Sequence, residues 1–97
     1  MYSELDPLLH SQLRLAIISF LVGIEEAEFN LLKEKTGASG GNLSVQIDKL
    51  SQAGYLEVEK TYRGKKPLTL CRLTKNGLKA FETYVNDLKV YIHPKQK

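Results

Sequence analysis

Cysteine and histidine are scarce in this 97-residue sequence, which contains one cysteine, Cys71, and two histidines, His10 and His93. A single cysteine can neither close an intrachain disulfide nor build a cysteine-based metal site. The histidines lie at opposite ends of the chain without ligand partners nearby, so no metal site is expected. Because its neighbours alternate in character as in a strand, we interpret Cys71 as a small, partly buried apolar residue.

Long apolar runs are missing as well. The longest nearly apolar stretch, residues 15–24, is about half the length that a membrane-spanning helix needs. The acidic N-terminus has no signal-peptide pattern. Hydrophobic residues make up 42% of the chain and charged residues 26%, which is the composition of a globular domain. We expect one soluble, cytoplasmic domain spanning residues 1–97, whose marginal core would gain stability from association with a second copy.

Patterns typical of enzymes are not found. The sequence has no recognisable pair of catalytic carboxylates, no nucleophile with a matching base and no metal-ligand spacing. The glycine-rich stretch GASGG is not a nucleotide-binding fingerprint, because it follows a predicted helix rather than a strand and lacks the Lys-Ser/Thr ending. We therefore predict neither enzymatic activity nor a cofactor.

Acidic residues are missing between Lys60 and Lys79, a segment that holds seven of the 14 basic residues. The formal net charge is only +3, but all 11 acidic residues lie outside this segment, so positive charge is concentrated within it. Such a field suits phosphate, nucleic acid or another anionic surface. A basic face that is merely solvated is the alternative interpretation. The seven cations are Lys60, Arg63, Lys65, Lys66, Arg72, Lys75 and Lys79.

Apolar periodicity predicts two helices in the first part of the chain. The first has Ser11 as a candidate N-cap and ends near Gly23. It is apolar on two sides, so it is either the central helix of the core or shared with a partner subunit. Residues 4–9 could precede it as a short helix capped by Asp6. The second helix, of about two turns, ends at Gly37.

A third helix is predicted to begin at Gly40 and Gly41 and to end at Gly54, a candidate left-handed residue. Two helices joined by a short turn that contains glycine indicate a helix-turn-helix. The third helix has an apolar stripe with the i, i+4, i+7 spacing of an amphipathic helix. This stripe consists of Leu43, Ile47 and Leu50.

The period changes from helical to alternating after Gly54. Residues 55–62 and 68–73 read as two strands of a β-hairpin around the loop 63–67, whose tip carries three cations. Because an isolated two-stranded hairpin is unstable, we expect it to pack against the helices.

Thr74 is a candidate N-cap for a long last helix at about residues 75–92. The apolar residues of this helix follow a 3-4-3-4 spacing, which is typical of a coiled-coil-like seam. We expect packing against the core, at about residues 10–74, to account for the first two of them. The seam consists of Leu78, Phe81, Val85, Leu88 and Ile92, and Tyr84 and Tyr91 flank it.

The stretches NLSVQIDKLSQAGYLEVEK and RGKKPLTLCRLTKNG, followed by an amphipathic helix, resemble the winged helix-turn-helix transcriptional regulators of bacteria and archaea. The similarity is greatest to the compact single-domain group related to MarR- and ArsR-type repressors, and HSQLRLAIISFL is similar to their first helix. It covers about residues 10–92. The resemblance implies an α+β, mainly α, winged helix with a three-helix core, a two-stranded wing and a long C-terminal helix. It also implies a homodimer that reads double-stranded DNA.

Two features of those families have no counterpart in this sequence. The solitary Cys71 cannot supply the Cys/His metal ligands of many ArsR-type sensors. The chain also has little room for the ligand pocket that larger MarR proteins enclose. The resemblance therefore carries no prediction of a sensed metal or small molecule.

The outward arc of the third helix is the candidate base-reading surface. Asparagine and glutamine can pair bidentately with adenine, serine can contact base or phosphate, and valine can meet a thymine methyl. Gly40 and Gly41 either satisfy turn geometry or let a phosphate approach the helix N-terminus. Asp48 should point away from DNA or pair with a cation. The predicted recognition residues are Asn42, Ser44, Val45, Gln46 and Lys49.

The wing and the last helix complete the predicted interfaces. Arg63, Lys65 and Lys66 should contact the DNA backbone or the minor groove and supply affinity rather than sequence preference. A protein-interaction module without DNA binding is the alternative function, and RNA binding is a weaker one. The predicted dimer contacts are Val85, Leu88, Tyr91 and Ile92, with residues 5–9 as second contributors.

Overall fold

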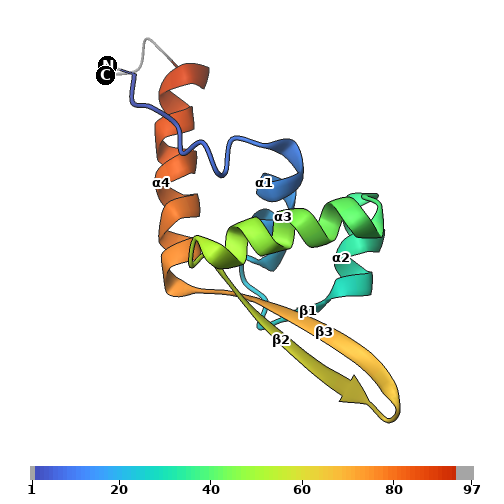
Figure 1. The fold of residues 1–97 in the computed structure, drawn as a ribbon. Coiled ribbons are helices and arrows are strands. Elements are labelled where there is room, and N and C mark those ends of the chain that lie inside the picture. The colour runs from blue at the N-terminus through green and yellow to red at the C-terminus, as the bar shows by residue number, and fades with distance from the viewer. Residues whose placement is uncertain (1, 94–97) are drawn as a thin grey trace.

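The computed structural model describes residues 2–93 and folds them into four helices and a three-stranded antiparallel sheet (Figure 1). This is the α+β, mainly α, winged-helix architecture that the sequence predicts. No helix within residues 2–93 has the length and apolar character needed to cross a membrane. In chain order the elements are α1 (Gln12–Leu21), β1 (Ala27–Glu28), α2 (Phe29–Thr36), α3 (Gly40–Gln52), β2 (Leu56–Arg63), β3 (Lys66–Leu73) and α4 (Lys75–Ile92).

The sheet contains one strand more than the predicted hairpin. The two-residue strand β1 pairs with β3 through Ala27 and Cys71, which gives the strand order β1-β3-β2. The hairpin turn is also tighter than the predicted loop 63–67, because Arg63 pairs directly with Lys66. Gly64 has a φ of +64° in this two-residue turn, a conformation that favours glycine. Strands β2 and β3 therefore extend almost to the wing tip.

The predicted helix ends are confirmed by local geometry. The side chains of Ser11 and Thr74 accept hydrogen bonds from backbone N–H groups in the first turns of α1 and α4. Gly37 and Gly54 follow α2 and α3 with φ values of +72° and +82°. The prediction of a short helix within residues 4–9 is wrong. Only a turn forms there, in which the backbone N–H groups of Leu9 and His10 both donate to the Asp6 carbonyl.

Helix α1 is the central helix of the core, as its two apolar sides predict. It contacts α2, α3, α4 and β3. The core is built mainly from aliphatic side chains that are essentially inaccessible to solvent. Cys71 is also fully buried, more than predicted, and burial raises the pKa of its thiol to about 11. The fully buried aliphatic residues include Leu9, Ile17, Ile18, Leu32, Leu43 and Leu50.

Helix α4 is rotated relative to the predicted seam. Its buried residues are Gly77 and Tyr84, whereas Leu78 is 38% exposed. The prediction that core packing accounts for Leu78 is therefore wrong, while Phe81 does pack against the core. The reason lies at Gly77: a Cβ there would collide with the backbone oxygen of Tyr55. The face of α4 that carries Gly77 therefore lies against the backbone just before β2. Tyr84 is on the same face, so it is buried in place of Leu78.

The C-terminal half of α4 extends beyond the three-helix core and runs beside the N-terminal segment (Figure 1). The Tyr91 hydroxyl donates a hydrogen bond of 2.8 Å to the carbonyl of Ser3. The rings of Tyr2 and Tyr91 lie 4.9 Å apart, centre to centre. The N-terminal segment therefore braces this half of the helix.

Candidate nucleic-acid interface

Helix α3 presents a largely uncharged polar surface. Its inward stripe is buried as predicted, and Ser39 caps the helix by accepting a hydrogen bond from the N–H of Asn42. Four of the five predicted recognition residues are exposed, and only Gln46 is half-buried. Val45 is 50% exposed, so one apolar side chain stands on this surface. Asp48 is exposed too, and it takes part in no ion pair found among residues 2–93.

A hydrogen-bonded chain of side chains links α1 to this surface. The Arg14 Nη1 donates to Gln46 Oε1 at 2.6 Å, and Gln46 Nε2 donates to Asn42 Oδ1 at 3.0 Å. Arg14 was not among the predicted site residues, because its partner lies 32 positions away in the sequence. The available signal was its charge, since Arg14 is the only charged residue in the otherwise mainly apolar helix α1.

The wing tip brings the three predicted cations together, but one of them is paired. Arg63 Nη2 donates to Glu28 Oε2 at 2.6 Å. This hydrogen bond raises the pKa of Arg63 above its usual value. Lys65 and Lys66 are exposed and take part in no ion pair found within the described part of the chain. The unpredicted strand β1 is what carries Glu28 to this position.

Arg72 is also neutralised, on the outer face of the sheet. It donates to Glu59 at 2.5 Å and lies 3.0 Å from Glu26 and 3.5 Å from Glu57. The hydrogen bond with Glu59 is the main reason that the pKa of Arg72 is raised. The basic segment predicted from the sequence is thus less positive in the fold than it is along the chain. Its charge is concentrated on the lysines.

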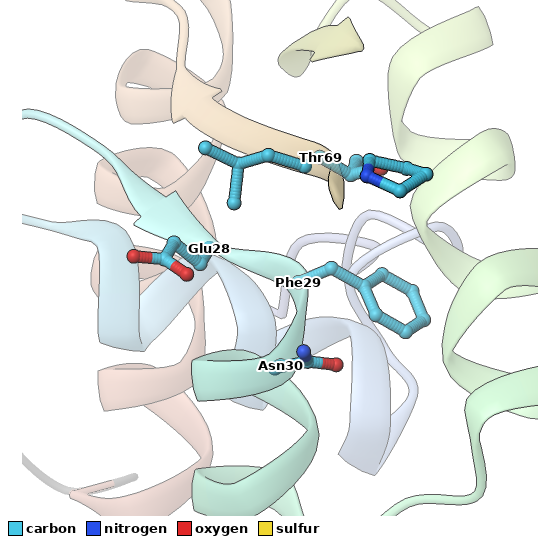
Figure 2. Close-up of a pocket in the computed structure, with 6 residues that line it drawn as sticks. Glu28, Phe29, Asn30 and Thr69 are labelled. Carbon is cyan, nitrogen blue, oxygen red and sulfur yellow. The ribbon is translucent and has the colours of Figure 1, made fainter. Parts of the chain in front are cut away.

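The wing is held against the start of α2. Glu28 and Phe29 lie beside Thr69 around a shallow pocket of about 110 Å³. Figure 2 shows the Glu28 carboxylate and the Phe29 ring on opposite sides of the backbone. Phe29 packs against the core, whereas Glu28 reaches Arg63. This pocket is smaller than the roughly 300–1,000 Å³ that small-molecule sites usually occupy.

A second groove joins the wing to α3. It has a volume of about 220 Å³ and lies between the two elements. Ser44 and Asp48 line it from α3, and Val58 and Lys60 line it from β2. The surface of α3 therefore continues onto the wing at Lys60 of β2.

A helix-turn-helix whose second helix is exposed beside a basic β-hairpin defines a winged-helix DNA-binding domain, the class that occurs in transcriptional regulators. The family model for the winged helix DNA-binding domain matches residues 13–92, and the chain belongs to this family. An uncharacterised protein of Methanocaldococcus jannaschii is 34% identical over 79 residues, which cover 81% of this chain and 86% of that protein.

Solved structures share the fold. A transcriptional regulator homologue from Pyrococcus horikoshii superposes with a TM-score of 0.83 and 24% identity, covering 93% of this chain and 89% of that one. A MarR variant from Escherichia coli in complex with operator DNA gives a TM-score of 0.71 and 20% identity, covering 91% of this chain and 68% of that one. The predicted relation to MarR-type regulators is confirmed at the level of the fold.

Proposed function

We propose that this protein is a transcriptional regulator that binds double-stranded DNA as a homodimer, with α3 in the major groove and the wing on the backbone or minor groove. The observation that carries the proposal is the continuous surface made by α3 and the wing. Its helix offers amide, hydroxyl and methyl groups to base edges, and its wing offers exposed lysines to phosphates.

In this arrangement Asn42, Ser44, Val45, Gln46 and Lys49 set the sequence preference. Arg63, Lys65 and Lys66 set the register and the affinity, because phosphate contacts carry no sequence information directly. Arg63 has to exchange its partner Glu28 for a phosphate.

The two glycines at the start of α3 support a close approach of DNA to the helix N-terminus. Neither Gly40 nor Gly41 has a positive φ, so the turn does not require glycine at these positions. A Cβ at Gly41 would meet nothing within 4 Å, and one at Gly40 would meet only the Lys33 side chain at 3.9 Å. Packing within the protein therefore does not explain the missing side chains. A phosphate that lies against the helix N–H groups would explain them.

The proposed dimer forms through the apolar side of α4 that the core leaves uncovered. Ile92 is 59% exposed and Leu78 is 38% exposed, and Val85 lies half-buried between them. An open groove of about 370 Å³ runs beside Val85. A continuous apolar strip of this kind is typical of a surface that is covered in an assembly.

Two of the predicted dimer contacts are less accessible in the single chain than the others. Leu88 packs partly against the core, and Leu9 is fully buried within the single chain. Any contribution from residues 5–9 therefore comes from the half-buried Leu5 and Leu8. Tyr91 is 44% exposed, and the part of its ring that does not pack beside Tyr2 is available for a dimer contact.

Selection of bound sequences from a random duplex pool, combined with light scattering on the free protein, tests the proposal. We expect recovered sites with two related half-sites about one helical turn apart, and a dimer in solution. A complete lack of DNA binding at low salt would refute the proposal.

A protein-interaction module without DNA binding is the second candidate. It is favoured by the exposed strip on α4 and by the pairing of Arg63 and Arg72 with carboxylates. A stable complex with another protein, without retention of DNA, would support this second function.

A further inference from the structure

We propose that Arg14, on α1, sets the hydrogen-bonding direction of the recognition surface, so that Asn42 meets DNA with its amide N–H groups. Arg14, Gln46 and Asn42 form what we call the amide relay. The proposal rests on the proposed DNA-binding function and names the kind of base edge that this function would select. Arg14 and Gln46 are positioning residues in this account, and Asn42 is the residue that touches the base.

The relay begins at a fixed point. Arg14 Nε donates a hydrogen bond of 2.6 Å to the carbonyl of Leu8, which lies in the turn before α1. That turn is itself closed by Asp6, whose side chain accepts from the N–H of Leu8 at 2.9 Å. Arg14 is half-buried, and its guanidinium bridges this turn and α3 through its bonds to Leu8 and Gln46. Arg14 therefore holds one orientation, with Nη1 directed at Gln46.

The direction of each amide then follows from hydrogen-bond chemistry. Arginine has only donors, so the Gln46 atom 2.6 Å from Nη1 must be the oxygen. The opposite end of that amide is Nε2, a donor, so the Asn42 atom 3.0 Å away must also be an oxygen. The nitrogen of Asn42 is left on the outside. No hydrogen bond from Asn42 Nδ2 is found among residues 2–93.

This polarity decides which base Asn42 can recognise. The bidentate pairing with adenine that the residue type suggests needs the asparagine oxygen to accept from adenine N6. In the relay Gln46 already uses one of the two lone pairs of this oxygen, whereas both N–H groups of the amide are free and require acceptors. Guanine offers neighbouring acceptors at N7 and O6 in the major groove, and thymine offers O4. We infer that Asn42 selects guanine first and thymine second.

The replacement Gln46→Glu reverses the relay. A carboxylate still accepts from Arg14, but it can only accept from Asn42 as well. Asn42 must then turn its NH₂ inward and expose its oxygen, which matches the donor groups of cytosine N4 and adenine N6. Gln52→Glu is the matched control, because it adds the same charge to an exposed position of α3 outside the relay. Arg14→Met removes the fixed donor, and Arg14→Lys keeps a donor-only side chain.

The experiment is selection from a random duplex pool with each variant, after circular dichroism has established that it is folded. For wild type we expect guanine or thymine at one position of each half-site, by roughly tenfold over adenine and cytosine. Gln46→Glu should move this preference to cytosine or adenine, Arg14→Met should reduce it severalfold, and Arg14→Lys and Gln52→Glu should retain it. The relay is refuted if Gln46→Glu and Arg14→Met bind with the wild-type preference. If Gln46→Glu binds too weakly for selection, Arg14→Met decides alone.

Failure of the proposed function would look different from failure of the relay. If wild type selects no duplex from the pool, the proposed DNA-binding function is refuted. The relay itself is then tested by NMR of the Asn42 and Gln46 side-chain amides in the free protein. Arg14→Met should shift both amide signals, and a spectrum in which neither moves would contradict the relay.

Discussion

Replacing Glu28 with glutamine should strengthen DNA binding by releasing Arg63 at the wing tip. The two side chains form an exposed ion pair of 2.6 Å, so Arg63 must give up a carboxylate before it can contact a phosphate. Glutamine retains the shape but not the charge. Because Glu28 competes with phosphate for Arg63 in wild type, its removal should steepen the slope of log K against log salt by up to about 0.9, the value of one full phosphate contact.

Fluorescence anisotropy with a selected duplex, measured between about 50 and 200 mM salt, gives this slope. Arg63→Ala should make the slope shallower, and the double variant Glu28→Gln/Arg63→Ala should behave as Arg63→Ala alone. Glu34→Gln, at an exposed position of α2, is the control for the loss of one negative charge. The reasoning is refuted if Glu28→Gln leaves the slope at the wild-type value, or if it increases affinity equally without Arg63.

Gly77→Ala should destabilise the fold by about 1–3 kcal/mol in chemical denaturation, because the added methyl collides with the backbone of Tyr55. Gly41→Ala should instead stabilise the fold by up to about 1 kcal/mol and yet weaken DNA binding; unchanged binding would contradict the close approach of a phosphate. If the proposed dimer forms through α4, Ile92→Glu should give a folded monomer in light scattering, and a variant that stays dimeric would exclude this face. The hydrogen bond with Asp6 raises the pKa of Tyr55 to about 12 from 10.0. Because the folded-state pKa is the higher one, this contribution to stability is complete below pH 10 and is lost as the pH rises toward 12; Tyr55→Phe should remove that part of the pH dependence of unfolding.

The sequence was sufficient for the features that depend on neighbouring residues. Helix caps such as Ser11 and Thr74 act within one turn, and the left-handed glycine after α3 is a local signal. The apolar stripe of α3 and the alternation of the hairpin strands likewise repeat over short distances. These local signals predicted the helix-turn-helix, the hairpin and the exposed face of α3, and the resemblance to winged-helix regulators implied how they combine into one fold.

The remaining features arise from contacts between residues that are distant in the sequence. Strand β1 has only two residues, too few to show an alternating pattern, and it exists because β3 offers it a partner. The ion pair of Arg63 with Glu28 joins positions 35 residues apart. The rotation of α4 depends on the carbonyl that Gly77 lies against. None of these contacts produces a periodic pattern in the sequence, so none of them could be predicted without the three-dimensional structure.

The salt dependence of DNA binding by wild type and by the triple variant Arg63→Ala/Lys65→Ala/Lys66→Ala tests the central claim most directly. We predict that wild type binds with a steep slope of log K against log salt. Removal of the three wing cations should flatten this slope by roughly two to three, while the selected half-sites stay the same. An unchanged slope in the triple variant, or no binding by wild type at low salt, would contradict the account.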